Sequence, residues 1–476
     1  MKAMCFVMIG VVLPLAACKR GPDFVPPETP APTAFRNDLA AGESVANVSW
    51  WDLYEDPALQ DLIRAGLQNN RNIREALSKI AESRANLGMV RADLYPSVNL
   101  IGLGTFQETL RVDSVSAFDN ARIMLSASYE VDLWGRVARS NEAALQGLLA
   151  TEEAFRTVTI SLVADIAGAY LVLRDLDARM EIAEATLETR RVGLELLSSR
   201  AQGGLVPLVD VARAEIELAD TEATIQALIR ARSQTENVLS LLVGRLPSDV
   251  TRGTSLEDQT FPPAVPAGLP SELLQRRPDI LAAERRLHAQ TAIIGVAEAA
   301  RFPSLSLTAA LGVKSTSLGE TRDGNVFTNL GANLLGPIFN AGRNKRRVEV
   351  ERARTEQLLN QYEQIVLNAF REVEDALVGV ETYRLESEAR VRQVNAASGA
   401  LEAAEARYEG GLTGYAEVLD LQRSLFGSQL KATEALQLHH SSIVQLYMAL
   451  GGGWSVEEDA VEGAVGANAT TPPNQP

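Results

Sequence analysis

The chain has 476 residues, which suffices for two or three ordinary domains or for one large repetitive architecture. Its 61 acidic residues outnumber its 45 basic ones and give a net charge of −16. A chain of this charge repels polyanions, so general nucleic-acid binding is disfavoured and no nucleic-acid partner is expected. The 46% of hydrophobic residues argues against disorder, and the abundance of Ala, Leu, Glu and Arg predicts a mostly helical protein.

The N-terminus is typical of a bacterial secretory signal. Residues 5–13 form an apolar stretch that is too short to span a bilayer but long enough for a signal-peptide core. The run Leu15-Ala16-Ala17-Cys18 resembles a lipobox, so residues 1–17 are expected to be removed and Cys18 to be acylated. Lys19 follows where an Asp would retain a lipoprotein at the inner membrane, which favours an outer-membrane address. An ordinary secretory signal with a chance cysteine is the alternative.

The sequence matches itself at a shift of 207 residues. Gly203-Gly204-Leu205 falls on Gly410-Gly411-Leu412, and other matches keep the same offset along most of both halves. Each half is therefore one supersecondary unit, and such copies bury a shared core when they lie side by side.

The repeat predicts a division of the chain into consecutive segments. We expect a signal peptide, a Pro-rich lipidated N-terminal segment, a first repeat, a Pro-rich linker, a second repeat and a disordered acidic tail. In that order, their ranges are 1–17, 18–50, 51–245, 246–270, 271–454 and 455–476.

Within each half the pattern predicts a helix, two strands and a very long helical hairpin. Apolar residues after Gly135 recur in steps of three and four, as at Phe155, Val158 and Leu162, which indicates a coiled-coil seam. A helix from about 137 to 202 would extend roughly 100 Å at ~1.5 Å per residue. Glycine pairs stop both long helices, so hairpin tips are expected at 203–206 and 410–413.

Four strands are expected at about 96–108, 120–133, 303–314 and 325–338. The last three largely alternate apolar with small or polar residues, which is the weak signature of a transmembrane barrel strand. No later run reads as a continuous transmembrane helix, so strands should make any further contact with outer-membrane lipids. A small soluble sheet or two exposed hairpins are the alternatives. Four strands cannot close a barrel and eight fill their own interior, so twelve strands from a homotrimer form the smallest open pore.

Six ordered motifs resemble the lipoprotein branch of the TolC-like outer membrane factors. They are Cys18-Lys19-Arg20-Gly21-Pro22-Asp23-Phe24 with Pro26, Trp50-Trp51 with Asp56-Pro57, Tyr129-Glu130-Val131-Asp132-Leu133-Trp134-Gly135-Arg136, Leu269-Pro270-Ser271-Glu272-Leu273-Leu274-Gln275-Arg276-Arg277-Pro278-Asp279-Ile280, Pro337-Ile338-Phe339-Asn340-Ala341-Gly342-Arg343 and Ala449-Leu450-Gly451-Gly452-Gly453-Trp454. The resemblance covers essentially the whole mature chain except the tail after Trp454.

The resemblance implies a mainly α fold with a transmembrane β-barrel. A homotrimer would form a twelve-stranded barrel in the outer membrane and a long α-helical tunnel across the periplasm. The family serves as the exit duct of tripartite pumps, with a periplasmic adaptor (membrane fusion) protein and an inner-membrane transporter, commonly of the resistance-nodulation-division (RND) type, as partners.

The same resemblance implies a periplasmic gate. Asp420 and Arg423 correspond to the family's constriction residues, whereas the family's apolar ring position is the small Ala416, so a tight apolar plug is not expected there. Without the resemblance, Asp and Arg three apart on a helix are a solvated ion pair worth little. The first half lacks this pair, and Asp210 and Arg213 are candidate partners for it.

Leucines at the hairpin tips predict a second interaction site. Leu205 and Leu412 follow the glycine pairs Gly203-Gly204 and Gly410-Gly411, and exposed leucines there suggest a docking surface for the adaptor. Packing of each leucine against its own hairpin is the alternative.

The sequence shows no recognisable constellation of catalytic, cofactor-binding or metal-binding residues. The three histidines, at positions 288, 439 and 440, have no cysteine or paired carboxylate at ligand spacing, and no nucleophile or phosphate-loop motif occurs. No catalytic, cofactor or metal site is therefore expected.

We interpret the sequence as a passive exit duct for small amphiphilic compounds, energised by its partners and with an acidic lumen that favours cations. A duct for type I polypeptide secretion and a lipid-anchored periplasmic coiled-coil scaffold without a pore are alternatives. A lipid-anchored enzyme is the remote third.

Overall fold

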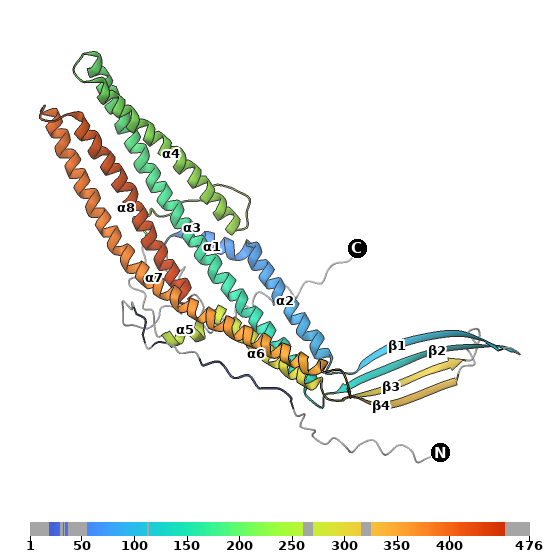
Figure 1. The fold of residues 1–476 in the computed structure, drawn as a ribbon. Coiled ribbons are helices and arrows are strands. Elements are labelled where there is room, and N and C mark those ends of the chain that lie inside the picture. The colour runs from blue at the N-terminus through green and yellow to red at the C-terminus, as the bar shows by residue number, and fades with distance from the viewer. Residues whose placement is uncertain are drawn as a thin grey trace. The chain divides into compact units, whose positions relative to one another are not determined.

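The computed structural model describes residues 19–28, 32, 34–36, 55–111, 114–259, 270–315 and 325–452. Cys18, the Trp50-Trp51 motif and the tail 455–476 lie outside these ranges. Helices and strands follow the order expected for two repeats (Figure 1). The elements are α1 (Pro57–Asn69), α2 (Arg71–Ala92), β1 (Ser97–Arg111), β2 (Ser114–Val131), α3 (Arg136–Gln202), α4 (Leu208–Leu242), α5 (Pro270–Arg276), α6 (Pro278–Ala299), β3 (Ser304–Ser315), β4 (Asn325–Leu335), α7 (Arg343–Glu409) and α8 (Tyr415–Ala449).

Three pairs of corresponding helices in the two halves have equal lengths. Helices α2 and α6 each have 22 residues, α3 and α7 each 67, and α4 and α8 each 35. The starts of α3 and α7, Arg136 and Arg343, lie 207 positions apart, as do the starts of α4 and α8. The expectation of two structural repeats is thus confirmed.

The chain divides into two compact units, which we call the strand unit and the hairpin unit. The strand unit comprises the described parts of Met1–Thr29, Ser78–Glu153 and Ala282–Gln364, and it contains all four strands. The hairpin unit comprises the described parts of Pro30–Leu77, Ala154–Leu281 and Ile365–Pro476. The long helices α3 and α7 begin in the first unit and continue in the second.

The strand unit is built on one antiparallel sheet of order β1-β2-β3-β4 (Figure 1). Its register runs Leu100↔Leu125, Leu125↔Leu311 and Leu311↔Thr328. Strand β2 begins at Ser114, six residues before the expected start, because its ladder with β1 continues to the pair Arg111↔Ser114. Pairing with β1 extends β2 beyond the stretch in which apolar residues alternate.

The core of the hairpin unit is the apolar seam of α3. Ile166, Tyr170 and Leu173 are fully buried there and pack with residues of α1, α4 and α8. An 18-residue window of α3 has a mean hydropathy of 1.5 and passes a length and composition test for a membrane span, although 56% of that window is buried within the protein. The core helix of a soluble domain meets the same test, so this finding identifies no membrane segment.

One buried carboxylate joins the start of the first repeat to the linker that follows the repeat. Asp56 caps α1 by accepting from the amide of Ala58 at 2.9 Å, and it also accepts from Tyr170 Oη at 2.8 Å, from Thr254 N at 3.0 Å and from Gln259 Nε2 at 2.8 Å. A Cβ at Gly253 would lie 1.9 Å from Asp56 Oδ1, so only glycine fits beside it. Burial, followed by the hydrogen bond to Asp56, raises the pKa of Tyr170.

Candidate channel, gate and docking sites

The sheet has two chemically different faces, because successive strand residues point to opposite sides. One face, the apolar face, carries large side chains that are between 39% and 75% exposed. They are Val98, Leu100, Ile123, Leu125, Leu307, Leu311, Val313, Val326, Leu330 and Leu334. The opposite, polar face carries mainly Ser, Thr and Asn, including Ser97, Asn99, Ser126, Ser128, Thr308, Asn329 and Asn333. This division suits a transmembrane barrel strand, with lipid against the apolar face and water against the polar face.

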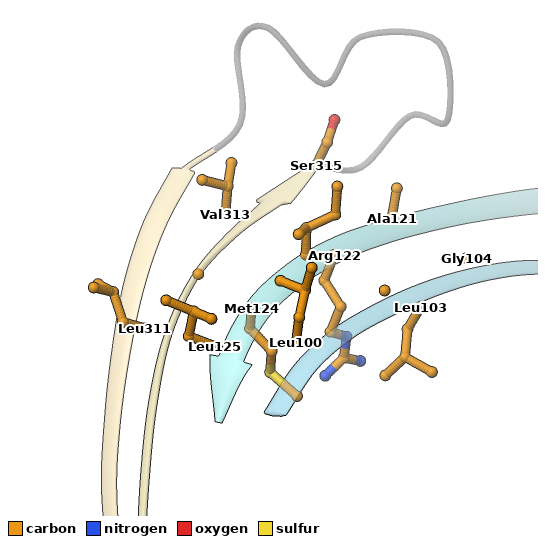
Figure 2. A pocket seen from close by; sticks show the side chains of 13 residues that line it. Leu100, Leu103, Gly104, Ala121, Arg122, Met124, Leu125, Leu311, Val313 and Ser315 are labelled. Atoms are coloured by element: carbon orange, nitrogen blue, oxygen red, sulfur yellow. The ribbon is translucent and has the colours of Figure 1, made fainter. Parts of the chain in front are cut away.

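A hollow of about 590 Å³ lies against the sheet where the strands curve (Figure 2). Leu100, Leu125, Leu311 and Val313 contribute to its lining. Its walls are mainly aliphatic, and among the described residues that line it the one charged residue, Arg122, occupies a strand position of the polar face. The hollow therefore suits hydrocarbon and offers no constellation for catalysis.

The N-terminal residues next to Cys18 are held by the strand unit. The Arg20 guanidinium lies 4.7 Å from the ring centroid of Phe302 and 5.5 Å from that of Trp134. Asp23 forms an ion pair of 2.6 Å with Arg139, whose side chain is 3% exposed. Because Trp134 follows β2 and Phe302 precedes β3, this segment is attached at the roots of the strands.

The expected gate residues form an ion pair on α8. Arg423 Nη2 lies 2.8 Å from Asp420 Oδ1, and the two side chains are 64% and 69% exposed. Ala416 is half-buried one turn earlier. Arg423 has a second partner, Glu217 of α4, at 3.6 Å. The described residues thus bring Glu217, rather than Asp210 or Arg213, to the gate pair.

Glu217 also neutralises a buried cation. Arg190 of α3 is 2% exposed in its side chain, and its Nη2 lies 2.9 Å from Glu217 Oε2. Its Nη1 donates to Thr221 Oγ1, and its guanidinium lies 5.2 Å from the ring centroid of Phe426. Burial lowers the pKa of Arg190, while the charge of Glu217 opposes that shift. A charged network therefore joins α3, α4 and α8.

Sequence reasoning missed Arg190 and Glu217, although a signal for the first exists. Arg190 continues the α3 seam in steps of three and four, since it falls between Leu187 and Leu194, which pack in the apolar core. A charge at a seam position indicates a buried ion that requires a partner. No comparable signal marks Glu217.

Both hairpin tips end in the backbone conformation that glycine favours. Gly204 and Gly411 have φ of 72° and 71°, and the following Leu205 and Leu412 donate their amides back into the long helices at 2.9 Å. The side chains of Leu205 and Leu412 are 77% and 75% exposed. They therefore do not pack against their own hairpins.

The first glycine of each tip pair, at positions 203 and 410, is also exposed. On the first tip, Leu208 and Val209 add to the apolar surface with exposures of 78% and 55%.

Among the described residues, no group of three or more His, Cys, Asp or Glu side chains is arranged to hold a metal ion. His288 stacks on Phe24 at 4.4 Å, and its Nε2 lies 3.2 Å from Glu142. Burial lowers the pKa of His440 to about 3. These contacts give both histidines structural roles.

The sequence matches the family described as outer membrane efflux protein over residues 62–245 and 269–452, one match in each repeat. It is 34% identical over 449 residues to the cation efflux system protein CusC of Escherichia coli O157:H7, covering 93% of this chain and 97% of CusC. It is 35% identical over 463 residues to the solvent efflux pump outer membrane protein SrpC of Pseudomonas putida, covering 94% and 98%. The open-state MtrE outer membrane channel of Neisseria gonorrhoeae superposes with a TM-score of 0.84 at 32% identity, covering 93% of this chain and all of MtrE.

These likenesses confirm the expected fold class, a mainly helical outer-membrane channel protomer with a few strands and two repeats. They also confirm the expected outer-membrane location, with the chain extending into the periplasm, and a role as the outer membrane component of an efflux system. The chain belongs to the outer membrane efflux protein family.

Proposed function

We propose that this chain is the passive exit duct of a tripartite efflux pump and works as a homotrimer. An RND-type inner-membrane transporter supplies the energy and selects the cargo, and a periplasmic adaptor joins the two. The observation that carries the proposal is the match of both repeats to one family of outer membrane efflux proteins, over nearly the full length of its relatives.

The open edges of the sheet support the trimer. Strands β1 and β4 are the edge strands, and the order β1-β2-β3-β4 leaves one side of each without a strand partner among the residues that the structure describes. Unpaired backbone groups cost several kcal/mol each in hydrocarbon, so neighbouring copies must pair with these edges. Because eight strands fill their own barrel, three copies with twelve strands give the smallest conducting closure.

Small amphiphilic compounds are the proposed cargo. The two sequence relatives are named for cation efflux and for solvent efflux, and this chain is nearly equally similar to both, at 34% and 35% identity. Similar ducts in systems named for such different cargo are best explained if the partners of each duct make the selection. This supports a shared exit and argues against a recognition site in the duct for one compound.

We assign the periplasmic constriction to Asp420, Arg423 and Ala416. Glu217, which contacts Arg423 within the same chain, would hold the constriction in place, and we call it the latch. The gate side chains are 64% and 69% exposed, so each contact is worth only about 0.2–1 kcal/mol. Three copies triple that small value, which an adaptor could reverse by binding. The exposed tips carrying Leu205 and Leu412 are the proposed adaptor-docking surfaces.

We also propose a lipid on Cys18. The attachment of Arg20 beside Trp134 and Phe302 supports it, since the acyl chains would then begin near the strand roots, where lipid is available.

Planar-bilayer recording of the purified full-length protein tests the duct. We expect stepwise single-channel currents from a trimer. We also expect that cells lacking this chain lose export of a fluorescent amphiphile and regain it when the chain is supplied again. A monomer that never conducts would favour the scaffold without a pore. A conducting trimer that exports a polypeptide but no small compound would favour type I secretion.

A further inference from the structure

Two cations that form no ion pair with any described residue lie opposite each other on the sheet. Side chains are described for strand residues 97–105, 121–131, 304–315 and 325–335, and within these ranges only Arg122, Glu130 and Lys314 are charged. Glu130 is bound by both Nε and Nη2 of Arg136, at 3.0 and 2.8 Å. Arg122 and Lys314 are exposed, and neither forms an ion pair with any described carboxylate.

The register brings the two cations together. Arg122 of β2 pairs directly with Lys314 of β3, in a row that continues to Leu103 on one side and Asn325 on the other. In Figure 2 the Arg122 side chain points to the same side of the ribbon as Leu103 and Met124, away from Ala121. This is the polar face, which in the proposed trimer lines the pore; the inference therefore rests on the proposed function.

The row lies near the outer end of β3 and β4, whereas β1 and β2 continue eight residue pairs farther, to Arg111↔Ser114. Lys314 is ten residues along β3 from Ser304, which corresponds to about 30 Å at ~3.3 Å per residue. The roots of the strands join the helices, so this distance brings the pair to the outlet. The pair and its copies would give six positive charges around the lumen.

Like charges directly opposite each other destabilise a sheet unless a counter-charge lies between them. In a narrow pore with low-dielectric walls, a ring of one sign also concentrates ions of the other sign. A single chloride relieves little of this repulsion, whereas clustered oxyanions can contact several cations together.

We propose that Arg122 and Lys314 form an anion-binding site at the pore outlet, which takes multivalent oxyanions of the oligophosphate class. The outlet then favours anions although the protein as a whole is acidic. A soluble oligophosphate entering from the strand-tip side should bind in the ring and obstruct the current.

The test is block of the full-length channel in planar bilayers by inorganic triphosphate. At low ionic strength, triphosphate added from the strand-tip side should block the parent, and block should weaken as salt is raised. The double variant Arg122→Gln, Lys314→Gln should raise the half-blocking concentration about tenfold or more and shift the reversal potential towards cation selectivity. The charge-conserving double variant Arg122→Lys, Lys314→Arg should keep the block.

Arg346→Gln is the matched control, since Arg346 is an exposed cation of the same unit outside the sheet. It should leave block unchanged. Equal block of the parent and the neutral double variant would overturn the site, and so would a conducting parent that triphosphate does not block; in both cases the duct itself would stand. A parent that never conducts would instead refute the proposed function, and the site with it. Trimer migration of each variant separates loss of charge from loss of folding.

Discussion

Neutralising Glu217 should destabilise the hairpins far more than neutralising the exposed gate residue Asp420. Glu217→Gln keeps the shape of the side chain but leaves Arg190, only 2% exposed, without its counter-charge. Breaking a buried ion pair from one side costs about 3–5 kcal/mol. Thr221 and the Gln oxygen can still accept hydrogen bonds, so we expect the lower end, about 3 kcal/mol. Loss of the 3.6 Å contact with Arg423 adds at most about 1 kcal/mol, because Arg423 is 64% exposed.

Hydrogen exchange of the detergent-solubilised full chain measures this cost at the site. The amides around Arg190 and Glu217 should exchange roughly a hundredfold faster in Glu217→Gln, which corresponds to about 3 kcal/mol of opening free energy. Asp420→Asn, at 69% exposure, should change exchange by less than about fivefold.

A double variant tests whether Arg190 depends on Glu217. Arg190→Met combined with Glu217→Leu removes both charges and should recover most of the stability, because well-packed apolar residues replace buried ion pairs at little cost. If Glu217→Gln exchanged no faster than Asp420→Asn, or if the double variant were as unstable as the single one, Arg190 would not depend on Glu217 and the latch would be refuted.

Four further outcomes are expected. Arg423→Ala should raise the single-channel conductance without altering the trimer, and parent-like conductance would put the constriction elsewhere. Leu412→Asp should abolish copurification with the adaptor while the trimer still forms; loss of the trimer would show that Leu412 has a structural role instead. Cys18→Ser should block lipidation, and the same chain behind a non-lipoprotein signal peptide should still insert; a wholly soluble product would contradict membrane-spanning strands. Burial holds the pKa of His440 at about 3 in the folded state, against an ordinary value of 6.5. Below pH 6.5 the unfolded state therefore binds more protons than the folded state, and the free energy of unfolding decreases as the pH is lowered. Between pH 7 and pH 5 the loss should be about 2 kcal/mol, and His440→Gln should remove it from the thermal unfolding profile; an unchanged profile would mean that His440 is protonated in the folded state.

The helical hairpins could be predicted because their signals are local. The seam of α3, the glycine pairs and the constant shift of 207 residues are visible without knowledge of any contact. The starts Arg136 and Arg343 accordingly lie at corresponding positions of the two repeats. The start of β2 at Ser114 was missed, since it depends on pairing with β1 rather than on its own residues.

The charged network needed tertiary information. Arg190 stands out on its seam, but the choice of Glu217 as its partner depends on how α3 and α4 pack. The repeat offered no help, because at a shift of 207 the two positions fall on Ala397 and Ser424. Cross-helix partners of this kind depend on which helices are neighbours and on how they are shifted along their axes, which the periodicity of one helix leaves undetermined.

The Asp56 carboxylate has a consequence for biogenesis. Its partners Thr254 and Gln259 follow it by 198 and 203 residues, and Tyr170 follows it by 114. A chain that emerges into the periplasm from its N-terminus must therefore expose this carboxylate, and the apolar residues of α1 beside it, until the whole first repeat has crossed the inner membrane. The entropic cost of closing so long a loop therefore arises at a late step of assembly. Periplasmic chaperones would consequently meet a nascent protomer whose first repeat remains open until Thr254 and Gln259, in the linker that follows it, have also been translocated.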